Sequence, residues 1–284
     1  MSGQSAGLPE YRAGIGLRTS HVARILDQKP EVPWFEVLMD NHTAQGGLIP
    51  RQLAAVREHY PLSLHCVGMS LGGVEPLDMD YLDTVRRMLH EYGAAQVSDH
   101  LCFTRYGQHH FNDLLPIPFT AESLAHVSGR VAQVQEYLGT PILVENVSTY
   151  LQFTDSEMTE AEFMTELVAS TGCGILLDIN NAYVNEFNHG YSAKTFIDSI
   201  PIEYVGEVHL AGYEDKDDYL IDAHNNRVSD AVWRLFDHYL QSGHRAPVLI
   251  EWDNDIPELD ILLDEMGRAQ RRINQYSQTA AGVV

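Results

Sequence analysis

The sequence predicts a single-domain α/β protein that folds as a closed (β/α)₈ barrel, the TIM-barrel architecture. Eight short strand-like runs recur along the 284 residues, and segments with the helical period separate them. No Pro/Gly-rich linker or internal repeat divides the chain. Strands that alternate with helices pair in parallel, because each crossover returns the chain to the same edge of the sheet. An open, doubly wound sheet is the alternative arrangement.

The predicted strands are apolar runs of ordinary strand length. In chain order they cover residues 14–18, 34–39, 61–66, 95–100, 141–145, 174–179, 204–210 and 247–252. We expect the domain to span residues 1–284, with short flexible tails at about 1–11 and 275–284.

Helix boundaries are recognisable between these strands. After Thr120, which fits an N-cap, apolar residues recur at steps of three and four until Gly139. Thr159 and Glu162 have the spacing of a capping box, and Gly172 ends that segment. Similar apolar stripes follow three further positions, Asp80, Ser229 and Glu258.

The composition excludes several classes of protein. Eighteen Lys and Arg against 40 Asp and Glu give a formal charge of −22, which repels nucleic-acid backbones and anionic lipid surfaces. The N-terminus has no basic start followed by an apolar stretch, and no segment reaches membrane-spanning length. The three cysteines form no CxxC pair and suit a reducing compartment. We therefore expect a cytoplasmic protein with no nucleic-acid or membrane partner.

Residues that can bind metal ions gather at the ends of the predicted strands, where a barrel has its mouth. They occur in the segments SLHC, SDHL, LVENV, LLDINN, EVHLAG, LIDAH and LIEWD. The nine candidate ligands are His65, His100, Glu145, Asp178, Asn181, His209, Asp222, His224 and Glu251. Any one of them alone would be an ordinary loop histidine, capping residue or solvated carboxylate. Nine of them at one barrel mouth would be very costly to desolvate without cations, so we predict a metal site.

The kinds of ligand narrow the choice of metal. All nine are oxygen or nitrogen donors with several imidazoles, which favours zinc, iron or manganese over calcium or magnesium. Asp222 and His224 lie on one side of an extended segment, as a chelate needs, and Asp178 and Asn181 could reach two neighbouring ions. Glu145 lies midway in barrel order, where a bridging carboxylate would be placed. More than one metal ion is therefore expected.

Other residues are candidates for substrate contacts, namely Glu36, Asn41, Asn146 and His189. Glu36 and Asn41 surround the end of the second strand, and His189 lies in the loop after the sixth. Ordinary capping or turn hydrogen bonds would explain these residues as well. Cys66 is expected in the core, because strand alternation points it away from its neighbour His65.

As an ordered set, these motifs resemble one known family. They are GIGLR, SLHCVGMSLGG, VSDHL, DLLPIPFT, PILVENVSTYL, LLDINNAYVNEFNHG, EVHLAGY, LIDAH and LIEWD, and they run from about Gly14 to about Arg271. This series is similar to that of the multinuclear non-heme iron-dependent oxidative enzymes. The family includes the methanobactin-biosynthesis oxidase and the enzyme that excises a carbon from a peptide cysteine in thiaglutamate formation.

The resemblance implies a xylose-isomerase-like barrel with two or three iron ions in mixed Fe(II)/Fe(III) states. It implies that dioxygen is the co-substrate for oxidation of a cysteine in a ribosomally made precursor peptide, which a separate partner protein recognises by its leader. Zinc or manganese remains the alternative to iron. The catalytic residues implied are His65, Glu145, Asp178 and His209. One metal ion would bind His65, His100 and the bridging Glu145. A second would bind Glu145, Asp178, His209 and Glu251. The third would bind Asn181, Asp222 and His224.

The chain departs from the commoner family pattern at two places. The usual EVHAENY is EVLMDNH at residues 36–42, and the usual HLAGH is HLAGY at residues 209–213. These positions are expected to contact substrate or to lie behind the ligands, so they leave the particular cysteine rearrangement open. Two other functions also fit the residues: a zinc-dependent hydrolase or sugar isomerase on the same barrel, and a binding or scaffold barrel with a structural metal.

Overall fold

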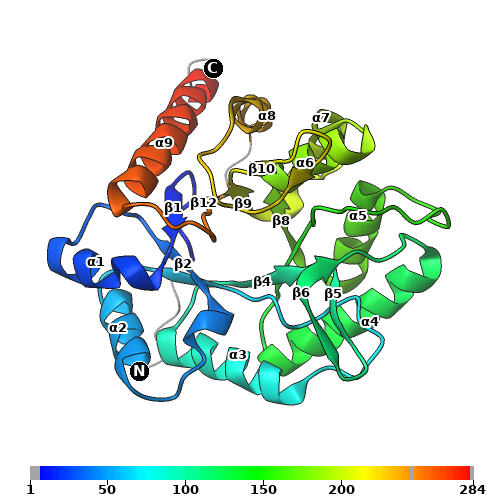
Figure 1. Cartoon of the computed structure of the whole chain (residues 1–284), viewed down its shortest axis with the longest axis horizontal. Coiled ribbons are helices and arrows are strands. Elements are labelled where there is room, and N and C mark those ends of the chain that lie inside the picture. The colour runs from blue at the N-terminus through cyan, green and yellow to red at the C-terminus, as the bar shows by residue number, and fades with distance from the viewer. Residues whose placement is uncertain (1–6, 244–245, 282–284) are drawn as a thin grey trace.

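Eight parallel strands close into a barrel in the computed structural model, which describes residues 7–243 and 246–281 (Figure 1). The strands are β1 (Ala13–Gly16), β2 (Phe35–Leu38), β3 (Leu62–His65), β4 (Val97–His100), β7 (Leu143–Glu145), β8 (Gly174–Asp178), β9 (Val205–Leu210) and β12 (Val248–Ile250). They pair in chain order, and β12 pairs with β1 to close the ring. The predicted (β/α)₈ barrel is confirmed, and the open doubly wound sheet is wrong.

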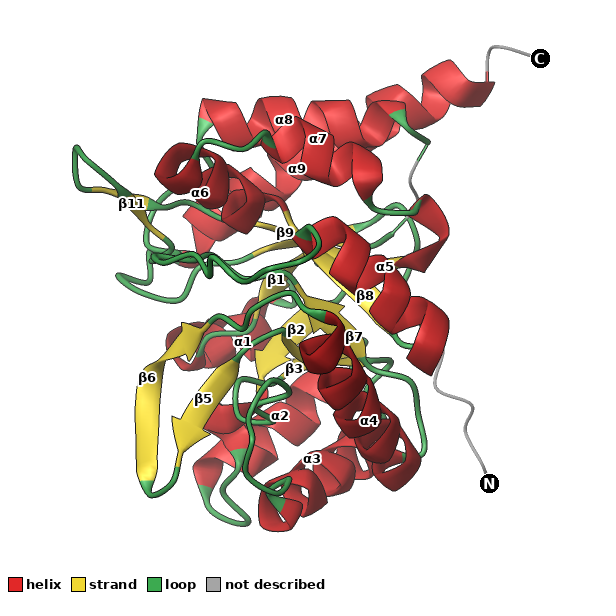
Figure 2. Ribbon diagram, turned by 90° about the vertical axis from the view of Figure 1, so that its right-hand side faces the viewer, coloured by secondary structure: helices red, strands yellow, loops and turns green. Residues whose placement is uncertain are grey.

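Two antiparallel hairpins extend the loops that follow β4 and β9, and the sequence patterns did not predict them. One consists of β5 (Phe103–Tyr106) and β6 (His109–Leu115), and the other of β10 (Glu214–Asp215) and β11 (Leu220–Ile221). Most of β6 is exposed, so its residues lack the apolar alternation of a half-buried strand. Figure 2 shows both hairpins on the same side of the barrel, which is the side of the mouth.

A ring of helices covers the outside of the barrel (Figure 1). The helices are α1 (Val22–Gln28), α2 (Leu48–Arg57), α3 (Met79–Tyr92), α4 (Ala121–Leu138), α5 (Glu160–Thr171), α6 (Ile179–His189), α7 (Ala193–Ser199), α8 (Asp230–Gln241) and α9 (Leu259–Ala281). Short 3₁₀ turns occur at η1 (Thr19–His21), η2 (Met39–His42) and η3 (Ile202–Tyr204). None of the helices in the described part of the chain has the length and apolarity needed to cross a membrane.

The predicted helix ends follow from local hydrogen bonds. The Thr120 side chain accepts from the backbone of Ser123, and Thr159 and Glu162 form the complete capping box of α5. Helix α3 begins earlier than expected, because Asp78 caps it. Helix α9 continues to Ala281, so the described part of the expected C-terminal tail is helical. Residues 1–6 and 282–284 of the expected tails lie outside the described residues.

The hydrophobic core lies between the strands and the inner faces of these helices. Every residue of β1, β3 and β4 is buried, and α4 buries the stripe predicted from its period. Cys66 belongs to this core and is fully buried, as its alternation with His65 predicts. Rigid strands therefore carry the side chains that point into the mouth.

Candidate metal centre

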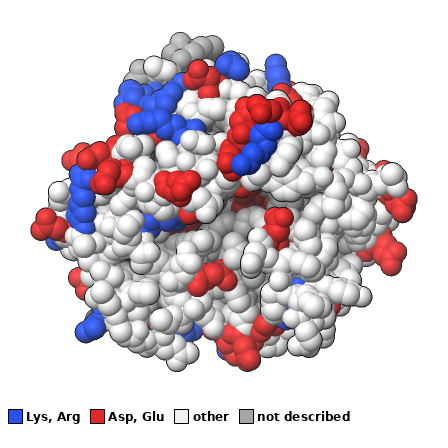
Figure 3. Space-filling view, in the orientation of Figure 1, with Lys and Arg blue, Asp and Glu red and all other residues white. Residues whose placement is uncertain are grey.

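The predicted ligands converge at the carboxyl ends of the strands. His65, His100, Glu145 and Asp178 are the last residues of β3, β4, β7 and β8, and Glu251 directly follows β12. Parallel pairing holds these ends at one level, with His100 opposite Glu145 in the register. Figure 3 shows the face that carries the mouth, with a central hollow and acidic side chains in and around it.

Two imidazoles and a carboxylate make the first group. The Nε2 atoms of His65 and His100 lie 3.2 Å apart, and they lie 3.5 and 3.3 Å from Glu145 Oε2. The other ring nitrogen of His65, Nδ1, lies 2.8 Å from Ser98 Oγ. The Ser98 hydroxyl can therefore orient the His65 ring while Nε2 faces the group. All three members of the group are buried, and they could hold one metal ion.

Glu145 also faces a second group through its other oxygen. Its Oε1 lies 4.0 Å from His209 Nδ1, which in turn lies 3.0 Å from Glu251 Oε2. Glu145, Asp178 and His209 each bring a ligand atom within 4.8 Å of the others. The two oxygens of one carboxylate thus point to two groups, the arrangement that a bridging ligand requires.

A third group forms around His224. Its Nε2 lies 2.5 Å from Asp222 Oδ1 and 4.0 Å from Asp178 Oδ2, and its Nδ1 lies 3.1 Å from Glu251 Oε2. Asp222 also accepts a hydrogen bond of 2.8 Å from Asn180 Nδ2. Asp178, His224 and Glu251 could hold another ion.

Asn181 was expected to share a metal with Asp222 and His224, but its amide nitrogen faces a different way. Nδ2 donates to the backbone oxygen of Asn146 at 3.0 Å and lies 3.5 Å from Glu145 Oε1. The structure therefore places the amide of Asn181 beside the first two groups, while the preceding residue, Asn180, contacts Asp222.

Two acidic residues behind His209 were missed or given another role. Glu36 and Glu207 are both buried, and one oxygen of each lies 3.3 and 3.4 Å from His209 Nε2. Glu36 was expected to touch substrate; in the structure it is buried against His209, and Glu36, His209 and Glu251 form a further group that could hold a metal ion. Glu207 could have been found from alternation, because residues 207 and 209 of β9 point to the same side.

The remaining substrate candidates have structural contacts or lie apart from the groups. His189 Nε2 lies 2.7 Å from Thr149 Oγ1 and 2.8 Å from Thr149 O, so its ring braces the loop after β7. Asn41 is exposed in η2. Tyr213, one of the departures from the family pattern, packs its ring 5.4 Å from that of Tyr183. Among the described residues, no hydrogen bond or ring contact joins His189 or Tyr213 to a candidate metal ligand.

Asn146 was also expected to contact substrate, and in the structure both ends of its side-chain amide are hydrogen-bonded to the backbone of Asp178. It is fully buried, its Nδ2 donates to Asp178 O at 2.9 Å, and its Oδ1 accepts from Asp178 N at 2.9 Å. Both ends of this amide hold the backbone of Asp178. Asn146 therefore fixes the position of Asp178, the candidate metal ligand at the end of β8.

Replacing Asn146 with alanine is expected to weaken both the fold and the site. Two buried hydrogen bonds are lost, so the free energy of unfolding should fall by about 2–4 kcal/mol, and metal affinity by about 10–100-fold. Denaturant unfolding and a metal titration measure the two effects, with the exposed Asn274→Ala as the control. An Asn146→Ala variant with the metal affinity of the parent would contradict this role.

Several polar atoms of the cluster are buried without a hydrogen bond. Glu145 Oε2, Asp178 Oδ2 and Asn181 Oδ1 have no hydrogen-bond partner among the residues that the structure describes. Native proteins rarely leave such atoms unsatisfied, because each costs about 1–3 kcal/mol. Cations would satisfy all three at once, so the donor set fits bound metal ions.

The pKa shifts of the buried carboxyls and histidines also agree with bound metal ions. Burial raises the pKa of Glu145 well above its usual range, that of Asp178 to about 7 and that of Glu36 to about 8. Burial acts to lower the pKa of His209, but the Glu36 and Glu251 carboxylates outweigh it and raise that pKa well above the usual range. Without cations the cluster therefore retains protons at neutral pH. Metal binding should displace those protons.

The stability of the metal-free protein should consequently fall as the pH rises from 7 to 8. Unfolded carboxyls have pKa values near 4 and unfolded histidines near 6.5, whereas Glu36 titrates at about 8 in the fold. Burial would lower the pKa of His100, but Glu145 raises it to about 9. The folded state thus binds more protons than the unfolded state. Each extra proton makes the slope of the free energy of unfolding against pH more negative by about 1.4 kcal/mol per pH unit. Chelator-treated protein that gained stability between pH 7 and 8 would contradict this sign.

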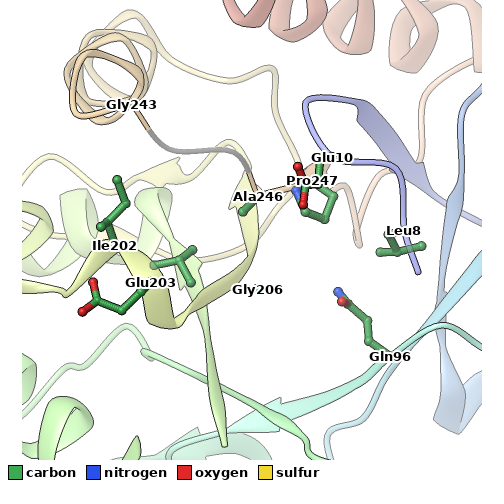
Figure 4. A pocket seen from close by; sticks show the side chains of 10 residues that line it. Leu8, Glu10, Gln96, Ile202, Glu203, Gly206, Gly243, Ala246 and Pro247 are labelled. Atoms are coloured by element: carbon green, nitrogen blue, oxygen red, sulfur yellow. The ribbon is translucent and has the colours of Figure 1, made fainter. Parts of the chain in front are cut away.

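A pocket lies at the end of the barrel opposite the candidate metal centre (Figure 4). Gln96, Val205 and Pro247, which lie at the starts of their strands, line a volume of about 440 Å³. None of the nine predicted ligands lines it, so it is separate from the candidate metal centre.

The fold and the cluster define a (β/α)₈ barrel protein with a candidate polynuclear metal site. The chain belongs to the family of RiPP precursor modification enzymes MbnB/TglH/ChrH, whose sequence profile matches residues 12–274. RiPPs are ribosomally synthesised and post-translationally modified peptides. The resemblance found in the motifs is therefore confirmed.

Relatives and solved structures agree with this assignment. A UPF0276 protein of Acaryochloris marina is 44% identical over 264 residues, covering 93% of this chain and 95% of the relative. A D-tagatose 3-epimerase-like protein aligns with a TM-score of 0.63 at 13% identity, covering 95% and 99% of the two chains. A xylose isomerase domain protein from Alicyclobacillus acidocaldarius gives a TM-score of 0.54 at 13% identity, covering 93% and 97%. At such low identity the two solved structures support the fold alone.

Proposed function

We propose that this protein is an iron-dependent oxidative enzyme that uses dioxygen to modify a cysteine of a ribosomally made precursor peptide. Membership of the precursor-modifying family gives the substrate class. The single observation that carries the metal dependence is the group of buried polar atoms without a hydrogen bond on Glu145, Asp178 and Asn181. The mixed imidazole and carboxylate donors favour iron over calcium or magnesium, and zinc or manganese is the alternative.

The chain's own residues have distinct tasks in this proposal. His65, His100 and Glu145 would hold one ion, and Glu145, Asp178, His209 and Glu251 a second. Asp222 and His224 would hold a third beside Asp178. Bound iron in mixed Fe(II)/Fe(III) states would supply the one-electron chemistry with dioxygen and a binding place for the cysteine thiolate.

Other residues would keep this arrangement fixed. Ser98 Oγ orients the His65 ring, and the buried Glu36 and Glu207 lie against the far nitrogen of His209. Asn146 holds the Asp178 backbone. Bulk water does not reach His209 and Asp178, since neither side chain has exposed surface. We also propose a cytoplasmic location and a separate partner protein that recognises the leader of the precursor.

Co-expression with a small cysteine-containing peptide encoded nearby, under iron supplementation, tests the function. We expect the mass of the peptide to change only when both iron and oxygen are present, and the size of the change identifies the rearrangement. A peptide whose mass stays unchanged with iron-loaded protein in air would argue against the proposal. Equal modification by zinc-loaded protein without oxygen would instead support a zinc-dependent hydrolase.

A further inference from the structure

An apolar cavity of about 540 Å³ lies beside the mouth of the barrel. Its walls are formed by the loop after β7, the beginning of α5, helix α7 and the segment 116–119 before α4. Leu151, Phe153 and Tyr191 line the cavity while remaining 39–49% exposed, so its opening is apolar as well. None of the nine predicted metal ligands lines this space. Exposed apolar surface of this kind is typical of a binding site.

One carboxylate in this apolar lining has an oxygen without a hydrogen bond. Glu160, the first residue of α5, has a buried Oε1 with no hydrogen-bond partner among the described residues. Burial raises the pKa of its carboxyl to about 8, although a hydrogen bond from the Val147 backbone opposes the shift. An unpaired carboxylate oxygen in an apolar cavity is stabilised by a ligand that brings a positively charged donor.

The cavity and the candidate metal centre share one short loop. Thr149, which lines the cavity, is four residues after Glu145, and four residues span at most about 14 Å. The Thr149 N–H donates to Asn185 Oδ1 at 2.8 Å, and the Thr149 hydroxyl lies 2.7 Å from His189. These contacts hold the cavity wall in place before any ligand arrives. An extended peptide of about four residues is therefore long enough to reach from Thr149, on the cavity wall, to Glu145.

We propose that this cavity binds an apolar side chain of the precursor peptide and that Glu160 pairs with a lysine or arginine next to it. The inference rests on the proposed function and adds a specificity site to it, about four residues from the modified cysteine. Charge complementarity supports a basic occupant, because the chain carries a formal charge of −22 and acidic groups surround the mouth (Figure 3).

Binding of labelled peptides to the full chain tests the inference. Three fluorescein-labelled peptides of equal length would carry Leu-Lys, Leu-Glu or Gly-Lys four residues from a cysteine, with anisotropy as the readout. We expect the Leu-Lys peptide to bind at least about tenfold more tightly than the other two, because it fills the apolar cavity and supplies a charged donor. Hydrogen exchange with this peptide should show protection at residues 149–160 and 191–199.

Two variants separate the contribution of Glu160 from general effects. Glu160→Gln should abolish the preference for Leu-Lys over Leu-Glu, whereas Glu166→Gln, the same change at an exposed position of α5, should retain it. Leu151→Ser, at a half-exposed position in the cavity lining, should weaken binding of the Leu-Lys peptide several-fold. Equal binding of the Leu-Lys and Leu-Glu peptides, or a preference that persists in Glu160→Gln, would overturn the inference.

Failure of this inference can be told apart from failure of the proposed function. The anisotropy measurement requires neither iron nor turnover. An iron- and oxygen-dependent mass change without any peptide preference would overturn the cavity proposal and leave the oxidative function standing. Protection confined to a surface outside residues 149–160 and 191–199 would also overturn it, because the occupant would then bind elsewhere.

Discussion

Replacing Glu145 with glutamine should abolish turnover and lower the iron content by at least one ion per chain. The two oxygens of Glu145 face two groups, Oε2 towards His65 and His100 and Oε1 towards His209. Glutamine keeps the size of the side chain but replaces one of these oxygens with an NH₂ donor, which repels a cation. Mutation of a residue that only contacts a metal ligand typically lowers metal affinity or activity about 10–100-fold. Mutation of a bridging metal ligand should therefore lower them by more than about 100-fold.

Elemental analysis and peptide mass measurement check the two parts of this prediction. Glu166→Gln makes the same chemical change on the exposed side of α5 and should leave iron content and product formation unaltered. Wild-type iron content in Glu145→Gln would exclude Glu145 as a ligand. Wild-type product formation would remove it from the proposed chemistry.

Removal of metal should destabilise the fold by several kcal/mol. The mouth brings Glu145, Asp178 and Glu251 together in the interior, and cations offset their mutual repulsion. With free metal at about 1,000 times its Kd, binding stabilises the folded state by about 4 kcal/mol. Chelation should therefore lower the Tm by roughly 10 °C.

Differential scanning calorimetry with and without chelator measures this effect. The Glu145→Gln variant provides a matched comparison, because it should bind less metal and so lose less stability on chelation. Equal Tm values for chelated and iron-loaded wild-type protein would contradict the account.

The sequence contained enough information to predict the barrel and the level at which the ligands meet. Strand and helix periods, with caps such as Thr120 and Thr159, are local signals that survive folding unchanged. Because parallel strands end at one edge, the position of His65 or Glu145 along its own strand predicts its height in the barrel. The exposed hairpin of β5 and β6 lacks such a period and was missed for that reason.

Pairings within the site depend on angles that sequence spacing does not supply. Asp178 accepts the N–H of Asn181 at 2.7 Å, so α6 starts directly after β8. Successive helical side chains then diverge by about 100°, which sends Asn180 towards Asp222 and Asn181 towards Glu145. A similar limit applies to Asn146, whose contacts with the Asp178 backbone depend on the neighbouring strand.

Anomalous diffraction at the iron absorption edge, on crystals of anaerobically iron-loaded protein, tests the central claim most directly. The account predicts one iron peak between His65, His100 and Glu145, and at least one more among Asp178, His209, His224 and Glu251. Loaded crystals with no iron peak at these side chains, or with iron bound only elsewhere, would contradict it.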